Sequence, residues 1–214
     1  MSIRNITTEI EDRAKLVSSL LNKHLHENDS VLDIGCGHGL PRLFLKQCKY
    51  HGVECRRYPE HTFKNVVYLN LNTDSLPYKN ASFDAIICTE VLEHLFDLDL
   101  ILKEMRRVLK RTGVLVISLP NEITLDNRIR CLFGTYPPKI NEFSHHWFFT
   151  LNEADVFVRR FFDILEKKYI FSCKGGRFMS QMLKSLLAKT FPSFFAGSQM
   201  YLLKFKNEYP SAKR

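Results

Sequence analysis

The nine residues Val31-Leu32-Asp33-Ile34-Gly35-Cys36-Gly37-His38-Gly39 constrain the fold of this chain more than any other segment. Their apolar start is typical of a buried strand, and the three glycines let the backbone turn sharply and approach a bound molecule closely. A strand, a glycine-rich turn and a helix open many nucleotide-binding α/β domains, whose ligands lie at the carboxyl ends of the strands. The spacing here is G-x-G-x-G, because position 40 is a leucine. This excludes the dinucleotide fingerprint G-x-G-x-x-G, and the chain contains no P-loop sequence.

The same segment resembles the first motif of class I S-adenosylmethionine (SAM) dependent methyltransferases, whose strand typically reads V-L-D-x-G-C-G-x-G. The resemblance covers roughly residues 30–165 and points to the type-11 group, which includes MetW-like proteins and ubiquinone O-methyltransferases. It implies that SAM is the cofactor and that the turn passes under its methionine part. The residues that match the family's turn are Asp33, Gly35, Cys36, Gly37 and Gly39. The alternative is a tight turn that binds nothing.

The resemblance also implies where the nucleoside part of SAM binds. The acid that closes the second strand accepts hydrogen bonds from both ribose hydroxyls in this family, and Glu54 matches it; the alternative is a surface glutamate at a strand end. Relatives often place D-L-N or D-A before a Leu-Pro pair, where the aspartate binds the adenine amino group. This chain has Asn70, Leu71 and Asn72 there. The amide oxygen of Asn70 is still able to accept that hydrogen bond, and the backbone amide of Leu71 is placed to meet the ring.

Hydrophobic periodicity divides the chain into alternating helices and strands. We expect strands over 30–34, 50–54, 66–71, 83–88, 114–119, 161–171 and 199–205. We expect helices over 9–26, near 40–48, from a cap at Asp97 or Asp99 to a stop at Gly113, over 151–160 behind the capping box of Thr150 and Glu153, and near 178–190. The alternation predicts an α/β fold with a doubly wound, mostly parallel sheet. The resemblance implies a Rossmann-like sheet of seven strands with an antiparallel last strand.

The chain of 214 residues is long enough for a single SAM-binding domain over 1–214, with a core at about 30–173 and a candidate lid or interfacial segment at 174–198. No stretch approaches the ~20 apolar residues of a membrane span, and the amino terminus lacks the apolar core of a signal peptide. The six cysteines include no C-x-x-C pair. They are expected to be reduced thiols of a cytoplasmic protein rather than a disulfide framework or a zinc site.

Positive charge is concentrated near the carboxyl terminus. The net charge is +8, and between Lys167 and Asn207 there are eight Lys or Arg residues and no Asp or Glu. Such a run suggests an anionic partner, either an anionic substrate, nucleic acid or an acidic membrane surface to which the protein binds peripherally. The alternative is a solvated basic face that only aids solubility.

The sequence Thr89-Glu90-Val91-Leu92-Glu93-His94 follows the strand expected at 83–88, at the sheet edge where ligands bind. Thr89 and Glu90 are therefore further candidates for the cofactor site. On a helical turn, Glu90, Glu93 and His94 would project from one face, as a half-site for Mg²⁺ or Mn²⁺.

Ubiquinone-pathway O-methyltransferases and small-RNA 2′-O-methyltransferases are similar in this segment, and the resemblance implies a metal whose shell His145 or His146 completes. Two alternatives remain open. Glu93 and His94 shape the pocket only, or a neutral His94 acts as general base. The catalytic candidates are His94, His145 and His146.

Oxygen is the favoured acceptor atom. No [DN]-P-P-[YF] motif of amino-group methyltransferases and no cysteine nucleophile follows the strand expected at 83–88. The expected substrate wall is 121–147, where N-R-I-R-C-L-F-G and H-H-W-F-F-T are similar to type-11 sequences. We therefore expect methylation of a small-molecule or lipid-linked acceptor. An RNA ribose methyltransferase is a less favoured alternative because no recognition module is appended, and a non-catalytic SAM-binding partner is the third.

Overall fold

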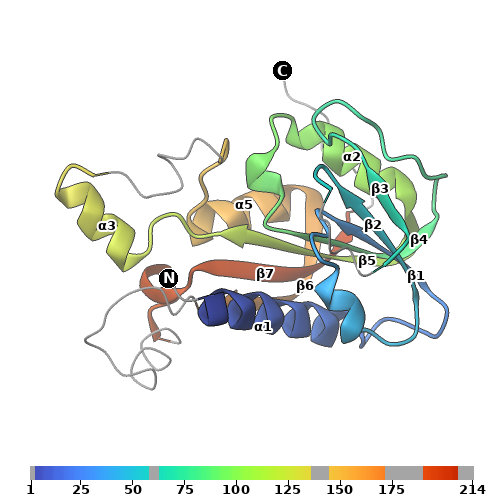
Figure 1. The fold of residues 1–214 in the computed structure, drawn as a ribbon. Coiled ribbons are helices and arrows are strands. Elements are labelled where there is room, and N and C mark those ends of the chain that lie inside the picture. Colours follow the sequence, from blue (N-terminus) through green and yellow to red (C-terminus); the bar gives the residue numbers. More distant parts are fainter. Residues whose placement is uncertain (1–2, 58–62, 136–144, 172–189, 207–214) are drawn as a thin grey trace.

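The computed structural model describes residues 3–57, 63–135, 145–171 and 190–206. Within them, seven strands form one sheet in the order β3-β2-β1-β4-β5-β7-β6 (Figure 1). β7 runs antiparallel to β5 and β6, while the remaining pairs are parallel. This confirms the doubly wound α/β sheet with an antiparallel last strand. The strands are β1 (Ser30–Ile34), β2 (Lys49–Glu54), β3 (Val66–Tyr68), β4 (Phe83–Thr89), β5 (Leu109–Pro120), β6 (Phe162–Ile170) and β7 (Ser198–Phe205).

The order of the strands reverses between β1 and β4. From β1 the sheet continues to β2 and β3 on one side, and from β4 it continues to β5 on the other. Ile34 and Cys88 are neighbours in the register, so these two strands end side by side. In open α/β sheets, ligands bind at such a switch point, outside the carboxyl ends of the strands. The glycine turn after Ile34 and the acidic segment after Thr89 therefore lie at the same edge.

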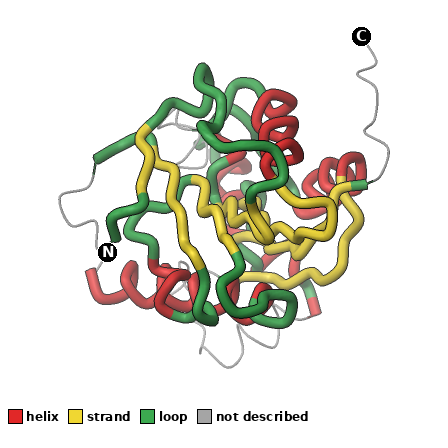
Figure 2. The backbone as a smooth tube through the Cα atoms, turned by 90° about the vertical axis from the view of Figure 1, so that its right-hand side faces the viewer, coloured by secondary structure: helices red, strands yellow, loops and turns green. Residues whose placement is uncertain are grey.

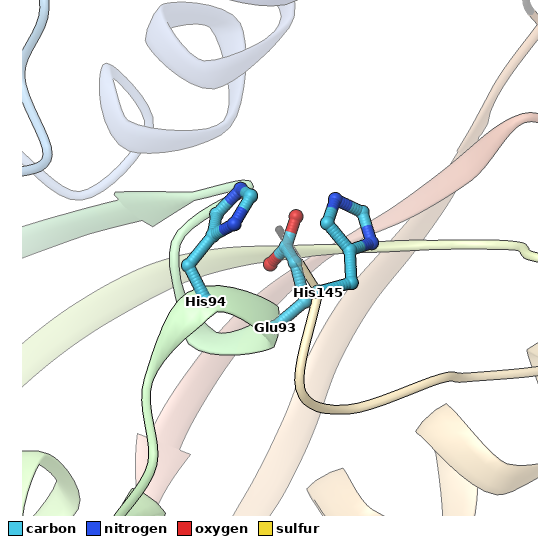
Figure 3. Close-up of side chains that lie close together, drawn as sticks. All are labelled: Glu93, His94 and His145. Carbon is cyan, nitrogen blue, oxygen red and sulfur yellow. The ribbon is translucent and has the colours of Figure 1, made fainter. Parts of the chain in front are cut away.

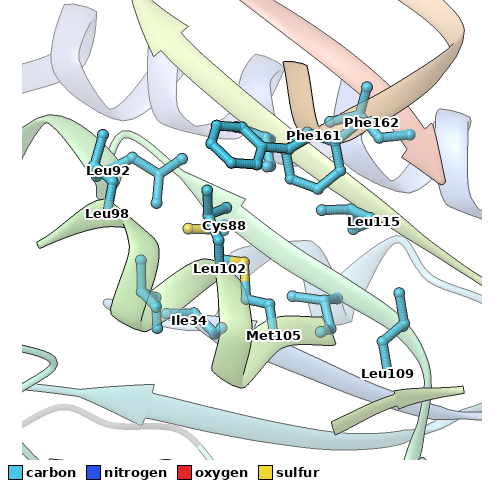
Figure 4. Close-up of a cluster of buried hydrophobic side chains, with 14 of the residues drawn as sticks. Ile34, Cys88, Leu92, Leu98, Leu102, Met105, Leu109, Leu115, Phe161 and Phe162 are labelled. Carbon is cyan, nitrogen blue, oxygen red and sulfur yellow. The ribbon is translucent and has the colours of Figure 1, made fainter. Parts of the chain in front are cut away.

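Helices cover both faces of the sheet (Figures 1 and 2). On one face lies α1 (Ile3–Leu21), whose Val17, Leu20 and Leu21 pack in one cluster with apolar residues of β1, β4 and β5. The other face is covered by α2 (Leu98–Val108) and α5 (Leu151–Phe161). Their side chains join a larger core, part of which is drawn in Figure 4. Burial on both faces explains why β4 and β5 are almost continuously apolar.

The prediction of an α-helix near 40–48 is wrong. The segment forms one 3-10 turn, η1 (Leu40–Leu43), and then runs directly to β2. Asn22, directly after α1, supplies hydrogen bonds that a continued helix would have made within itself: its Nδ2 donates to the carbonyl of Phe44 (2.9 Å), and its Oδ1 accepts from the amide of Lys46 (2.9 Å). Side-chain bonds from the turn that follows α1 thus replace the local pattern.

The expected end of the following helix was also wrong. α2 begins behind Asp97, whose carboxylate accepts from the amide of Leu100 (3.1 Å), but it ends at Val108, and β5 starts with Leu109. Gly113 lies inside that strand instead of stopping the helix. A Cβ there would come within 2.9 Å of the backbone oxygen of Asp84, so the glycine allows β5 to approach β4 at the irregular register beside Phe83.

The remaining expected elements that lie within the described residues are present, although α1 begins and ends earlier than the helix expected over 9–26, and β3 ends at Tyr68 instead of residue 71. The capping box is present, with Glu153 N–H donating to Thr150 Oγ1 (3.1 Å) and Thr150 N–H to Glu153 Oε2 (2.9 Å). The strand pair expected at 161–171 and 199–205 is confirmed as β6 and β7. Two short helices were not expected, α3 (Leu125–Leu132) and α7 (Pro192–Phe195).

The helix expected near 178–190, and most of the candidate lid at 174–198, lie outside the described residues. Among the helices that the structure does describe, none has the length and apolar character needed to cross a bilayer.

Candidate active site

The turn after β1 depends on its glycines. Gly35, Gly37 and Gly39 all have positive φ, at 72°, 49° and 65°. At Gly35 a Cβ would lie 2.3 Å from Cγ2 of Val91, so this position also allows the turn to pack against the segment that follows β4. At Gly37 a Cβ would meet nothing within 4 Å. The turn is therefore packed at its start and open at Gly37, where a bound molecule can approach the backbone.

Asp33 lies in β1 directly before this turn and is buried. Its carboxylate accepts a hydrogen bond from the hydroxyl of Tyr50 in β2. Burial raises the pKa of Asp33 to about 7, because the charged form loses its hydration, although the bond from Tyr50 favours ionisation. The pKa of Tyr50 is raised by burial and by the neighbouring carboxylate. Asp33 thus links β1 to β2 beneath the turn.

Glu54 connects the end of β2 to the same turn. Its Oε2 accepts from the backbone amide of Gly37 (2.9 Å), and its Oε1 accepts from the amide of Cys55 (2.8 Å). Each carboxylate oxygen has a second acceptor position. Oε1 also accepts from the thiol of Cys55 (3.3 Å) and the amide of Arg56 (3.4 Å), whereas the amide of Gly37 is the one donor given for Oε2. The carboxylate is therefore held at the sheet edge, and Oε2 is the oxygen better able to accept a further hydrogen bond in the ribose-binding role expected for Glu54.

The segment expected to bind adenine forms a local turn. Asn70 Oδ1 accepts from the amide of Asn72 (3.0 Å), and Asn72 Oδ1 accepts from the amide of Phe96 (2.8 Å). Leu71 between them is buried in the larger core. The side-chain oxygen of Asn70 thus already shapes the loop, and the loop is attached to the segment that follows β4.

Thr89 ends β4, and Glu90 after it does not continue into a helix. Glu90 has a left-handed φ of 54°. Its Oε1 accepts from the hydroxyl of Ser118 (2.8 Å), and its Oε2 lies 3.7 Å from a guanidinium nitrogen of Arg13 in α1. The helical spacing expected for Glu90, Glu93 and His94 is not formed, because the only helical residues here are those of the 3-10 turn η2 (Leu92–His94).

Glu93 and His94 are instead brought together with His145. Their potential ligand atoms all lie within 4.8 Å of one another, and Figure 3 shows the carboxylate of Glu93 between the two imidazole rings. Glu93 is fully buried. The two histidine rings meet edge to face, with centroids 4.6 Å apart. A buried carboxylate beside two imidazoles is a set of groups suited to moving a proton or to holding a divalent cation.

His146 does not join this cluster. Its ring lies against Phe96, with centroids 4.1 Å apart, and the residue is exposed. Its backbone still contributes, because the amides of His146 and Trp147 both donate to the carbonyl of Glu93, at 2.7 and 3.2 Å. These bonds hold the segment that carries His145 against η2.

Glu122 is a residue that the sequence analysis did not single out. It follows β5 by two positions and is buried, and its Oε1 lies 2.8 Å from Nδ1 of His145. One signal for it was present in the sequence: a carboxylate directly after a buried strand lies at the same ligand-binding edge as Glu54 and Glu90. The site therefore contains a second buried carboxylate beyond those expected.

Comparison with known proteins agrees with this geometry. The family described as a methyltransferase domain matches residues 8–160, which include the glycine turn, Glu54 and the Glu93 and His94 pair. The chain belongs to this methyltransferase family. This confirms the resemblance of the glycine motif to class I SAM-dependent methyltransferases.

Individual relatives of this methyltransferase domain are more distant. A probable S-adenosylmethionine-dependent methyltransferase of Mycobacterium tuberculosis is 33% identical over 101 residues, covering 44% of this chain and 36% of the relative. A ubiquinone biosynthesis O-methyltransferase of Pelagibacter ubique is 30% identical over 121 residues, covering 50% of this chain and 48% of the relative. The matched region thus spans less than half the length of these curated relatives.

Solved structures share the fold of the methyltransferase domain. The 1,6-didemethyltoxoflavin-N1-methyltransferase of Burkholderia thailandensis, solved with its substrate and S-adenosylhomocysteine, superposes with a TM-score of 0.62 at 17% identity. The superposition covers 95% of this chain and 82% of that one. At this identity the likeness concerns the fold alone.

Proposed function

We propose that the protein transfers the methyl group of SAM to an oxygen atom of a small-molecule or lipid-linked acceptor. The observation that carries the proposal is the position of Glu93, His94 and His145 at the sheet edge that also carries the glycine turn. The relative from Pelagibacter ubique, named a ubiquinone biosynthesis O-methyltransferase, supports oxygen as the acceptor atom.

SAM would bind along the turn, with its methionine part over Gly37 and its ribose at Glu54. The open space at Gly37 and the remaining acceptor position of Glu54 Oε2 support this placement. The sulfonium of SAM is a good leaving group, so a dry and well-oriented pocket supplies most of the rate enhancement. The protein then needs only one further group, which removes the proton of the acceptor hydroxyl.

A histidine of the cluster is proposed to take that proton. A neutral imidazole at His94 or His145 is able to accept it as the oxygen attacks the methyl carbon. The buried carboxylate of Glu93 between the rings would stabilise the imidazolium that forms. Neither step requires Glu90, which is occupied by Ser118.

The same three side chains also fit a divalent metal. Imidazole and carboxylate groups suit Mn²⁺ and, with water completing the shell, Mg²⁺. Glu93, His94 and His145 would hold the ion, which would polarise the acceptor oxygen when bound. The fit rests on this donor set and on the full burial of the Glu93 carboxyl group. Glu90 is not part of the proposed metal set.

Anionic partners remain a proposal with weaker support. The basic run from Lys167 begins in β6, where Lys167 pairs with Asp155 (2.7 Å) and Lys168 with Glu166 (3.1 Å). Asp155 lies in α5 and Glu166 directly precedes the run, so these two positive charges are partly neutralised in the fold. Peripheral attachment to an acidic membrane would therefore have to use other basic residues, and so would binding of RNA as the acceptor. A location in the cytoplasm is part of the same proposal.

The proposal is tested by two measurements on the purified protein. Calorimetric titration with S-adenosylhomocysteine should show saturable binding. Transfer of tritiated methyl groups from SAM should then label catechols or phenols in a panel that also holds amines and a short RNA. His94→Gln and His145→Gln should abolish the label, whereas Glu166→Gln, which removes a carboxylate of β6 far from the cluster, should retain it. Absence of S-adenosylhomocysteine binding would overturn the proposal. Labelling of RNA alone would favour an RNA ribose methyltransferase. Binding of S-adenosylhomocysteine without any methyl transfer would favour a non-catalytic SAM-binding partner protein.

A further inference from the structure

The proposed reaction assigns no role to Glu122. Its side chain is nevertheless one of the few acidic side chains that are buried among the described residues. Only 4% of Glu122 and 6% of His145 are exposed. Burying a carboxylate is costly unless it is hydrogen-bonded. Here the partner is Nδ1 of His145 at 2.8 Å, from a segment 23 residues further along the chain.

The backbone of Glu122 is held from two sides. Its amide donates to the carbonyl of Phe149 (2.9 Å), and its carbonyl accepts from Nδ2 of Asn127 (2.9 Å). The first bond ties Glu122 to the stretch that carries His145, and the second ties it to α3. The carboxylate is thus delivered to one place on the imidazole ring by a loop with little freedom to move.

This contact determines which nitrogen of His145 carries the proton. An ionised carboxylate only accepts hydrogen bonds, so Nδ1 must be the donor. In a neutral imidazole the other nitrogen, Nε2, then has a free lone pair. Figure 3 shows one ring nitrogen of His145 on the side of Glu93 and His94 and the other turned away from them. Because Nδ1 is engaged by Glu122, the nitrogen that faces the cluster is Nε2.

We infer that Glu122 is a positioning residue that holds His145 in the tautomer with its proton on Nδ1, so that Nε2 presents its lone pair to the Glu93 and His94 cluster. The inference deepens the proposed function and rests on it for its purpose. A carboxylate behind an imidazole raises the basicity of the far nitrogen, whether that nitrogen accepts a proton or binds a metal. Glu122 itself touches neither substrate nor metal.

The tautomer is measured by nitrogen-15 NMR of histidine-labelled protein at pH 8, with the His145 signals assigned from their loss in His145→Gln. The wild type should show a protonated Nδ1 and an unprotonated Nε2. Glu122→Met, which keeps the length of the side chain and removes the acceptor, should lose this pattern. Glu122→Gln retains an acceptor oxygen and should keep it in part. Glu166→Gln serves as the matched control and should leave the pattern unchanged.

The consequence for the cluster is measured with Mn²⁺ alone, by calorimetric titration. Loss of such a supporting carboxylate typically costs about 10–100-fold in metal affinity. Glu122→Met should show that loss and Glu122→Gln a smaller one.

A wild-type His145 with its proton on Nε2, or an NMR pattern unchanged in Glu122→Met, would overturn the inference. If the wild type binds no Mn²⁺, the metal is removed from the proposed function, and the tautomer still decides the role of Glu122. If Glu122→Met does not fold, the wild-type tautomer and Glu122→Gln supply the answer.

Discussion

The backbone amide of Gly37 donates to the carboxylate of Glu54 over 2.9 Å, and this bond couples the turn after β1 to the end of β2. The two residues that we propose to bind different parts of SAM are thus in contact with each other. The arrangement is pre-organised, because Glu54 is held by the turn on one side and by the amide of Cys55 on the other.

Replacement of Glu54 should weaken cofactor binding. Glu54→Ala removes both the proposed ribose contacts and the bond to Gly37, so the affinity for S-adenosylhomocysteine should fall by about 10–100-fold, as expected for lost hydrogen bonds to a charged group. Glu54→Gln keeps the shape and should lose less. Calorimetric titration measures both values. An unchanged affinity in Glu54→Ala would contradict the ribose assignment.

Two alanine substitutions in the glycine turn should separate stability from binding. Both positions have positive φ, which costs an alanine about 1–2 kcal/mol. Gly35→Ala adds a methyl group 2.3 Å from Val91 and should destabilise the fold further, by about 1–3 kcal/mol. Gly37→Ala meets open space, so it should lose only this backbone cost of about 1–2 kcal/mol but bind S-adenosylhomocysteine weakly. Thermal unfolding and calorimetry on the same samples make the comparison; an equal loss of stability in both variants would refute it.

Asp33 should make the stability of the fold depend on pH. Its folded pKa of about 7 lies above the value of an unfolded aspartate, so the folded state binds the proton more tightly. The resulting stabilisation is complete below about pH 4 and is lost as the pH rises to about 7. The side chain of Asp33→Asn cannot ionise. The free energy of unfolding of this variant, relative to that of the wild type, should therefore increase by up to about 4 kcal/mol between about pH 4 and pH 7. Urea unfolding at several pH values measures the difference.

Asp84 provides the control of opposite sign. Burial opposes its ionisation, but hydrogen bonds from Lys110 (2.7 Å) and from the amide of Ser30 (3.0 Å) outweigh that effect and lower its pKa. The stability it contributes is present at neutral pH and is lost on acidification. Asp84→Asn should therefore lose stability relative to the wild type at pH 7 and approach it in acid. The same trend in Asp33→Asn and Asp84→Asn would contradict the assignment of Asp33.

The neighbouring histidines should differ in their effect on metal binding. His145 lies in the cluster with Glu93 and His94, whereas the ring of His146 lies against Phe96. His145→Gln should abolish calorimetric binding of Mn²⁺, and His146→Gln should leave it close to that of the wild type. Equal losses in the two variants would show that the cluster is not the binding site.

Local signals were enough to predict a large part of the fold. The alternation of apolar strands with amphipathic helices predicts the α/β sheet, and Thr150 with Glu153 marks the start of α5 because a capping box acts within four residues. The helix predicted near 40–48 was wrong because hydrogen bonds of this segment come from Asn22 in the turn after α1, which no local pattern reveals. Gly113 was misread for a similar reason, since the close approach of β5 to Asp84 depends on the neighbouring strand.

By itself, the sequence determined the methyltransferase family, most strands and the glycine turn, because the motifs and periodicities that indicate them involve residues within a few positions of one another. The composition of the acidic and histidine cluster was decided only by the tertiary structure. Glu90 has a left-handed φ and turns to Ser118, whereas loop closure over long separations brings His145 to Glu93 and Glu122 to His145. The family resemblance proposed His145 or His146 beside Glu93 and His94. The choice of His145, the exclusion of Glu90 and the addition of Glu122 depend on the packing of distant segments, which spacing along the chain does not determine.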